Sequence, residues 1–265
     1  MLPQTWRNWI ISNLMKGVDA SVLLNTLLDN GFNFGDCKRA LGSNLAKNTH
    51  YHKNAEFYAA LAAPKLLSQL QQLNAQVVEQ ERAQVIKIDG FLNAQECNSL
   101  VQLTKTTLRP STITEPNGYE GFRTSTTCDL SCVKDALVAG VEQKIIKTLG
   151  AAIPQGEVMQ AQHYAVGQQF KAHTDYFEPG TKEFLQFAKN RGQRTWTFMI
   201  YLNEGCEGGQ TEFPQLGLTF QPTLGSALIW NNLLVTGHPN PNTLHQSHPV
   251  IRGEKIVITK WFRDQ

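Results

Sequence analysis

The sequence has few cysteines, no long apolar run and no strong excess of one charge. Its five cysteines are an odd number without a Cys-x-x-Cys pair. Cys128 and Cys132 lack a second Cys or His pair at zinc-finger spacing. We therefore expect reduced cysteines, as is usual in a cytoplasmic protein. The net charge of +2 is too small to indicate nucleic-acid binding.

Membrane and export signals are also lacking. No apolar stretch approaches the roughly 18 residues of a membrane-spanning helix. The segment from Met1 to Trp9 has no basic part followed by a long apolar part, so we expect no signal peptide. These absences predict a cytoplasmic protein without a membrane partner, and they leave the oligomeric state open.

The remaining composition is that of a soluble globular protein. Hydrophobic residues make up 41% of the 265 residues and charged residues 17%. This length accommodates one large domain, or one domain with a small appendage.

Residues 1–78 are predicted to form a helical N-terminal region. Two helices are indicated by apolar residues at helical spacing: Trp6, Trp9, Ile10 and Leu14, and then Leu23, Leu24, Leu27 and Leu28. Asn30-Gly31 is expected to end the second helix. We interpret the region as an appendage packed on the core, although Gly31-Phe32 after short helices also faintly resembles a ubiquitin-associated module.

Residues 79–265 change from helical to strand patterns along the chain. A strand at 85–88 precedes a helix that Asn93 and Glu96 would cap, and Val133 to Ile145 carries a second helical stripe. Strands are predicted at 158–164, 195–202, 227–230 and 255–262, from their β-branched and aromatic residues. The expected fold class is α+β, with a sandwich or small barrel supported by helices.

One constellation indicates metal chemistry. His173 and Asp175 form a His-x-Asp pair, His245 follows much later, and Lys255 comes ten residues after it. Two histidines and one carboxylate occupy one face of an octahedral non-haem Fe(II) and leave positions open for a keto acid and dioxygen. Lysine suits the far carboxylate of such a keto acid. His-x-Asp alone is weak, so the interpretation depends on its surroundings.

Those surroundings consist of five ordered blocks: Tyr164 to Phe177, Gln193 to Asn203, Gly208 to Pro214, Pro222 to Asn232, and Thr243 to Trp261. In order and spacing they resemble the prolyl 4-hydroxylase group of 2-oxoglutarate/Fe(II)-dependent dioxygenases. The resemblance runs from about Gln84 to Arg263, about two thirds of the chain. It implies a double-stranded β-helix (jelly roll) with its core at about 155–265.

The resemblance also implies roles for individual residues. The iron ligands would be His173, Asp175 and His245, and the 2-oxoglutarate contacts would be Tyr164, Thr211 and Lys255. The substrate contacts would be Arg194, Trp230 and Trp261. Phe122 to Ser125 resembles the family's Arg-Thr-Ser segment. The implied reaction hydroxylates a prolyl residue of a peptide or protein with Fe(II), 2-oxoglutarate and O2, and ascorbate (vitamin C) is a further candidate cofactor.

The chain departs from the family pattern in two places. Asn240 stands where the family often has an acid shortly before the second metal histidine. Because a hydrogen-bond partner orients a ligand imidazole, an amide there is expected to weaken iron binding. The other departure is the N-terminal region of about 75 residues, which matches nothing in the catalytic core.

Several alternatives stay open at this stage. His238 and His248 compete with His245, but the spacing to Lys255 favours His245. A zinc hydrolase would need a general base such as Glu178 or Glu212. A non-catalytic jelly-roll binding or oxygen-sensing module, and a hydroxylase of free amino acids or other small molecules, are further possibilities. Gly208-Gly209 lacks the other elements of a phosphate-binding loop, so we expect a turn there.

The final strand provides an internal check. Side chains two residues apart point to the same face of a strand. Lys255, Val257, Thr259 and Trp261 therefore share one face, which places a co-substrate lysine and a substrate tryptophan on the same side of the predicted sheet.

Overall fold

The computed structural model describes residues 2–30, 32, 34–46, 55–106, 108–111, 122–130, 134–150, 156–188 and 191–264. The chain separates into two compact units, one ending at Asn54 and one spanning Ala55–Asp264. Within the described residues, no helix is long and apolar enough to cross a membrane.

The first unit contains the two predicted helices, α1 (Gln4–Met15) and α2 (Ala20–Asp29). It also contains α3 (Phe34–Leu41) and the 3-10 turn η1 (Gly42–Asn44), which were not predicted. Asp19 caps α2 by accepting a hydrogen bond from the Ser21 N–H at 2.7 Å. Ile10, Leu23 and Leu27 are buried together in a core of this unit's own. Gly31, the predicted helix end, lies outside the described residues.

The second unit combines helices with many short strands. The helical segments are α4 (Ala55–Leu61), η2 (Lys65–Ser68), α5 (Ala94–Lys105), α6 (Ala136–Leu149), the π-helical turn η4 (Phe184–Ala188) and η5 (Pro241–Thr243). The strands are β1 (Ala75–Glu79), β2 (Val85–Ile88), β3 (Arg109–Pro110), β4 (Thr126–Asp129), β5 (Gln160–Tyr164), β6 (Phe170–His173), β7 (Arg194–Tyr201), β8 (Glu207–Gly208), β9 (Thr211–Phe213), β10 (Leu218–Phe220), β11 (Ala227–Asn231), β12 (His245–Ser247), β13 (Val250–Arg252) and β14 (Lys255–Arg263).

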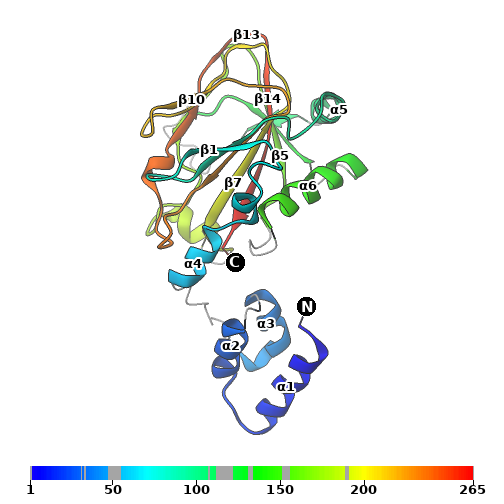
Figure 1. Ribbon diagram of the computed structural model, residues 1–265, viewed down its shortest axis with the longest axis vertical. Coiled ribbons are helices and arrows are strands. Elements are labelled where there is room, and N and C mark those ends of the chain that lie inside the picture. The colour runs from blue at the N-terminus through cyan, green and yellow to red at the C-terminus, as the bar shows by residue number, and fades with distance from the viewer. Residues whose placement is uncertain are drawn as a thin grey trace. The chain divides into compact units, whose positions relative to one another are not determined.

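These strands form a large sheet and a small one, both antiparallel. The large sheet has the order β1-β2-β11-β7-β14-β5-β4-β3, and the small sheet has the order β10-β9-β12-β6. A short pair, β13 and β8, extends the assembly. Strands distant in sequence lie side by side, as expected of the predicted jelly roll (Figure 1).

The large sheet is buried on both faces. Along β7, Trp196, Phe198 and Ile200 belong to a core shared with α5 and α6, which lie on one side of this sheet (Figure 1). The alternate residues Met199 and Tyr201 belong to a second core shared with the small sheet. Period-two alternation in one strand therefore supplies both a helix-facing core and the interior of the sandwich.

The helical appendage ends earlier than the predicted boundary at residue 78. Leu61 and Leu66 are buried in the core that α5 and α6 cover. Leu61 also accepts a hydrogen bond from the Trp196 indole at 2.9 Å. Residues 55–61 and 65–68 are helical as predicted, but their leucines pack in the core of the second unit. Residues 75–79 form β1 at the edge of the large sheet instead.

The predicted capping box is confirmed. Asn93 accepts from the Glu96 N–H at 2.9 Å, and Glu96 accepts from the Asn93 N–H at 2.8 Å. The four predicted strands correspond to β5, β7, β11 and β14 within a few residues. Val133 of the predicted second helix lies outside the described residues.

Two glycines with similar backbone angles test how tightly the large sheet and its loops pack. Gly225 has φ +71°, and a Cβ there would lie 2.0 Å from the Leu92 carbonyl oxygen. Gly217 has φ +68° with no atom within 4 Å. We expect Gly217→Ala to cost about 1–2 kcal/mol from the left-handed backbone alone. Gly225→Ala should cost about 1–3 kcal/mol more because of the clash. Urea unfolding measures both, and equal losses would contradict the packing argument.

Candidate active site

Two histidines and one aspartate meet where the small sheet's strands pair. His173 ends β6, His245 begins β12, and the two residues are direct antiparallel partners. Asp175 lies in the loop two residues after β6. One ligand atom from each residue lies within 4.8 Å of the others. Asp175 Oδ1 lies 3.9 Å from His173 Nε2, and Asp175 Oδ2 lies 3.9 Å from His245 Nε2.

Backbone carbonyls fix the orientation of both imidazoles. His173 Nδ1 lies 2.8 Å from the Lys171 carbonyl oxygen, and His245 Nδ1 lies 3.0 Å from that of Thr243. A carbonyl only accepts, so each Nδ1 carries the proton and each Nε2 keeps a lone pair. The Phe170 ring also stacks on His173 at 3.5 Å between centroids. The two lone pairs therefore face the carboxylate from a rigid frame.

The charge state of the cluster suits a divalent metal. Burial, together with the neighbouring His245, lowers the pKa of His173 to about 3. Burial by itself would raise the pKa of Asp175. The His245 and His173 imidazoles, Arg194 and a hydrogen bond from Thr197 outweigh that effect and lower it. Two imidazoles and one carboxylate form a mixed donor set that fits Fe(II).

Contrary to expectation, Asn240 forms no hydrogen bond with His173, Asp175 or His245. Its side-chain N–H donates to the Arg82 carbonyl at 2.9 Å, and its oxygen accepts from the Asn242 N–H at 3.1 Å. Asn240 thus stabilises the loop before β12 and links it to the Arg82 backbone. The Thr243 carbonyl supplies the hydrogen bond to His245 that an acid at this position was expected to provide.

Lys255 is a buried cation at the far end of the site. It is 1% exposed, and its Nζ donates to Ser247 Oγ at 2.8 Å and to Thr211 Oγ1 at 3.2 Å. No described carboxylate forms an ion pair with it, and burial lowers its pKa from 10.5 to about 7. Tyr164, its direct partner on β5, places its ring 5.3 Å from Nζ. An unpaired buried amine of this kind calls for an anion.

A single cavity joins the two ends of the site. It is lined by Arg123, Gln162, Tyr164, Phe170, His173, Asp175, Met199, Thr211, Trp230, His245, Gln246, Ser247, Lys255, Val257, Thr259 and Trp261. All the predicted site residues line it except Arg194. The period-two stripe of β14 supplies four of the lining residues, as the alternation predicted.

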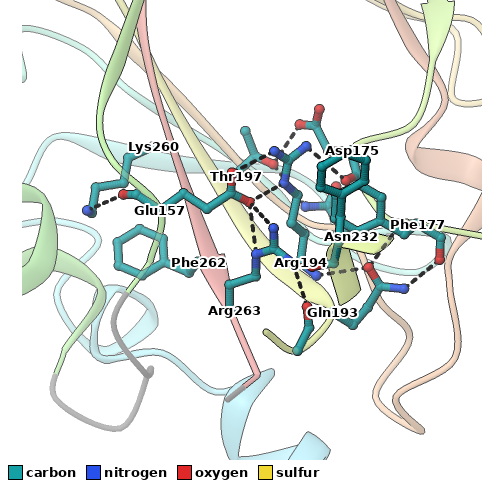
Figure 2. Close-up of polar contacts among 12 residues, drawn as sticks. Glu157, Asp175, Phe177, Gln193, Arg194, Thr197, Asn232, Lys260, Phe262 and Arg263 are labelled. Atoms are coloured by element: carbon teal, nitrogen blue, oxygen red, sulfur yellow. Dashed lines mark hydrogen bonds and ion pairs between the residues drawn. The ribbon is translucent and has the colours of Figure 1, made fainter. Parts of the chain in front are cut away.

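Arg194 is held beside the cavity by an acidic partner. Its guanidinium forms a two-pronged ion pair with Glu157, which also pairs with Arg263 at 2.8 Å (Figure 2). A third bond, 3.4 Å long, runs from Arg194 to the Asp175 carbonyl, and the guanidinium stacks 4.3 Å from the Trp261 ring. The predicted substrate arginine therefore braces the loop of a metal-facing residue and one wall tryptophan.

Sequence reasoning overlooked Gln162, which lines the cavity. Like the predicted Trp230 and Trp261, Gln162 has a buried side-chain N–H without a hydrogen-bond partner among the described residues. Gln162 sits one pleat from Tyr164 on β5, so strand alternation was the available signal. Arg123 stacks on Phe170 at 4.8 Å and belongs to the segment already noted for its Arg-Thr-Ser pattern.

Comparisons with known proteins identify the family of this chain. Residues 159–263 match the 2OG-Fe(II) oxygenase superfamily. The chain is 30% identical over 206 residues to probable prolyl 4-hydroxylase 9 of Arabidopsis thaliana, covering 69% of this chain and 70% of that one. It is 32% identical over 198 residues to prolyl 4-hydroxylase 2 of the same plant, covering 65% and 64%. The chain thus spans 64–70% of the length of these relatives.

A solved structure is similar in fold as well as sequence. The 2OG complex of the viral collagen prolyl hydroxylase from Paramecium Bursaria Chlorella virus-1 superposes with a TM-score of 0.54 at 25% identity. The match covers 68% of this chain and 95% of that one. It supports a jelly-roll core for the second unit.

Two buried lysines on β14 should respond oppositely to the same substitution. Lys255→Met removes a cation without an ion-pair partner, so the ligand-free protein should gain at least about 1 kcal/mol of unfolding free energy at pH 7. Lys260 is 3% exposed but bonds Glu142 at 2.6 Å and the Glu157 carbonyl at 2.7 Å. Lys260→Met should therefore lose about 1–3 kcal/mol.

Urea unfolding of the two variants against the unsubstituted chain measures both changes. In the unsubstituted chain the unfolded state binds the extra proton between pH 7 and 10.5, so its stability rises with pH over that window. The advantage of Lys255→Met should shrink accordingly. A lower unfolding free energy in Lys255→Met than in the unsubstituted chain would show that burying this lysine does not destabilise the ligand-free protein.

Proposed function

We propose that this chain, which belongs to the prolyl 4-hydroxylase group of 2-oxoglutarate/Fe(II)-dependent oxygenases, hydroxylates prolyl residues of a peptide or protein and releases succinate and CO2. As a member of that family it is a dioxygenase that uses Fe(II), 2-oxoglutarate and O2. One observation carries the proposal: a cavity with a His-Asp-His cluster at one end and a buried, anion-seeking lysine at the other.

The proposed iron ligands are His173, Asp175 and His245. The two Nε2 lone pairs and the carboxylate match the donors that non-haem Fe(II) takes from protein. When bound, Fe(II) and 2-oxoglutarate supply the oxidation, in which O2 provides the hydroxyl oxygen and the keto acid becomes succinate. The protein's own part is to hold the donors in place, with Phe170 stacked against His173.

The proposed 2-oxoglutarate contacts are Lys255, Thr211 and Tyr164. A carboxylate beside Lys255 would neutralise the buried ammonium, and the Thr211 hydroxyl lies 3.2 Å from the same nitrogen. Tyr201 donates to Thr211 at 2.8 Å and so orients that hydroxyl. Ser247, which bonds Lys255 at 2.8 Å, joins this set as a residue that the sequence did not single out.

The proposed substrate side of the cavity contains Trp230, Trp261 and, indirectly, Arg194. Both tryptophans line the cavity, where their rings offer apolar surface to a peptide. Arg194 contributes by bracing Trp261 at 4.3 Å. Free amino acids remain the second substrate class.

The zinc-hydrolase alternative has little support from the cluster's surroundings. Its candidate base Glu212 accepts hydrogen bonds from Gln246 and from His248, both at 2.6 Å. Glu212 is thereby committed to side chains other than the metal-facing ones. We further propose a cytoplasmic location, since Cys37, Cys97 and Cys206 are free thiols. Ascorbate is proposed as a reductant because the family resemblance implies it.

Turnover of 2-oxoglutarate tests the function. The chain, purified without oxygen and loaded with Fe(II), should form succinate, and proline-rich peptides should stimulate it and gain about 16 Da by mass spectrometry, the mass of one oxygen atom. Asp175→Ala should lose metal and turnover together, because one of three ligands is gone. A fully active Asp175→Ala variant would refute the ligand set. Succinate formation without any peptide product would instead favour a small-molecule substrate.

The affinity for 2-oxoglutarate should depend on pH through Lys255. Burial lowers the pKa of this lysine to about 7 in the ligand-free protein, and only the protonated form attracts a carboxylate. The Kd should therefore be nearly constant below pH 7 and rise up to about tenfold per pH unit above it. Calorimetric titration of Mn(II)-loaded protein measures this dependence. Lys255→Met should bind weakly at every pH, and a flat profile in the unsubstituted chain would exclude Lys255 as the carboxylate partner.

A further inference from the structure

Two buried side chains, Thr197 and Asn232, are hydrogen-bonded in series to the Asp175 carboxylate. Thr197 Oγ1 is 2.7 Å from Asp175 Oδ2, and Asn232 Nδ2 is 2.9 Å from the same Thr197 oxygen (Figure 2). An ionised carboxylate can only accept, so the Thr197 hydroxyl must donate to it. The hydroxyl's own acceptor site is then filled by the Asn232 amide. The direction of both hydrogen bonds follows from this chemistry.

Both residues are rigidly placed. Thr197 lies within β7 and Asn232 directly after β11, and each is 0% exposed. The backbone of Asn232 is fixed at both ends. Its backbone N–H donates to the Thr195 carbonyl at 2.6 Å, and its backbone carbonyl accepts from the Asn240 backbone N–H at 3.0 Å. Neither Thr197 nor Asn232 lines the cavity. They therefore act on the site only through Asp175.

Asp175 needs such support more than the two histidines do. Each imidazole belongs to a strand and is oriented by a nearby backbone carbonyl. Asp175 lies in a loop, and its carboxylate is oriented by side chains from the opposite sheet. Without the Thr197 hydrogen bond the carboxylate would be freer to rotate about its last torsion, a broad and weakly restrained one.

We propose that Thr197 and Asn232 are positioning residues for the metal centre. The two hydrogen bonds, from Asn232 to Thr197 and from Thr197 to Asp175, hold the Asp175 carboxylate in the rotamer that completes the donor set. The inference rests on the proposed role of Asp175 as a metal ligand. Outer hydrogen-bond partners of metal ligands typically contribute 10–100-fold in metal affinity.

Metal affinity, read without catalysis, tests the proposal. Metal-free full-length protein is titrated with Co(II) without oxygen, and the visible absorption of the bound ion reports the Kd. Thr197→Val removes the hydroxyl at nearly constant shape and should weaken Co(II) binding about 10–100-fold. Thr197→Ser keeps the hydroxyl and should restore binding to within about threefold of the unsubstituted chain. This rescue separates positioning from a general packing defect.

Thr195→Val is the matched control. Thr195 is a buried threonine on the same strand, and its hydroxyl donates to the Phe262 carbonyl at 3.3 Å rather than to the cluster. We expect unchanged Co(II) affinity for it. Equal weakening in Thr195→Val and Thr197→Val would overturn the proposal, as would an unaffected Thr197→Val. Asp175→Ala distinguishes the two levels: if it too binds Co(II) normally, the ligand assignment itself has failed.

A double-variant cycle tests whether the two residues act in series. Asn232→Leu removes the donor to Thr197 and should weaken Co(II) binding less than Thr197→Val does. If Asn232 acts through Thr197, the double variant should bind no more weakly than Thr197→Val alone. Fully additive losses would show that Asn232 does not work through Thr197.

Discussion

The pairing of β12 with β6 places His245 directly opposite His173, and the site depends on that register. Side chains alternate between the two faces of a strand, so a shift by one residue would turn His245 away from the cavity. The same pairing network sets Ser247 beside Thr211 and brings both hydroxyls to the Lys255 ammonium. One strand register thus builds the metal end and the carboxylate end of the cavity together.

The interior of the sandwich favours function at the expense of stability. Lys255 is buried without an acidic partner, and the indole N–H groups of Trp230 and Trp261 lack partners among the described residues. Each such group costs free energy in the ligand-free protein. A carboxylate ligand beside Lys255 would offset the cost of that buried amine.

Beside the cavity, a group of charged side chains is instead matched internally. Glu157 binds both Arg194 and Arg263, and Lys260 adds a bond to the Glu157 carbonyl (Figure 2). This network braces the loop that carries Asp175, while Thr197 supports its carboxylate from below. These partners support Asp175 from outside the cavity.

The grouping of His173, Asp175 and His245 and the jelly-roll class were predictable because ordered sequence blocks resemble a known family. The alternation of β14 likewise predicted that Lys255 and Trp261 face the same cavity. The sequence also indicated α1 and α2 of the first unit, whose apolar spacing is local. It did not reveal that residues 55–78 pack with the second unit.

Contacts between distant strands decided the rest. Asn240 bonds Arg82 rather than His245, Arg194 is held by Glu157, and Asn232 supports Thr197. Each partner is far away in sequence, and only the strand order brings the pairs together. The sequence by itself determined which chemistry the chain can carry, since that depends on residue types at fixed spacing. The tertiary structure decided which polar groups are satisfied and which stay available, because hydrogen bonding depends on neighbours that local patterns do not specify.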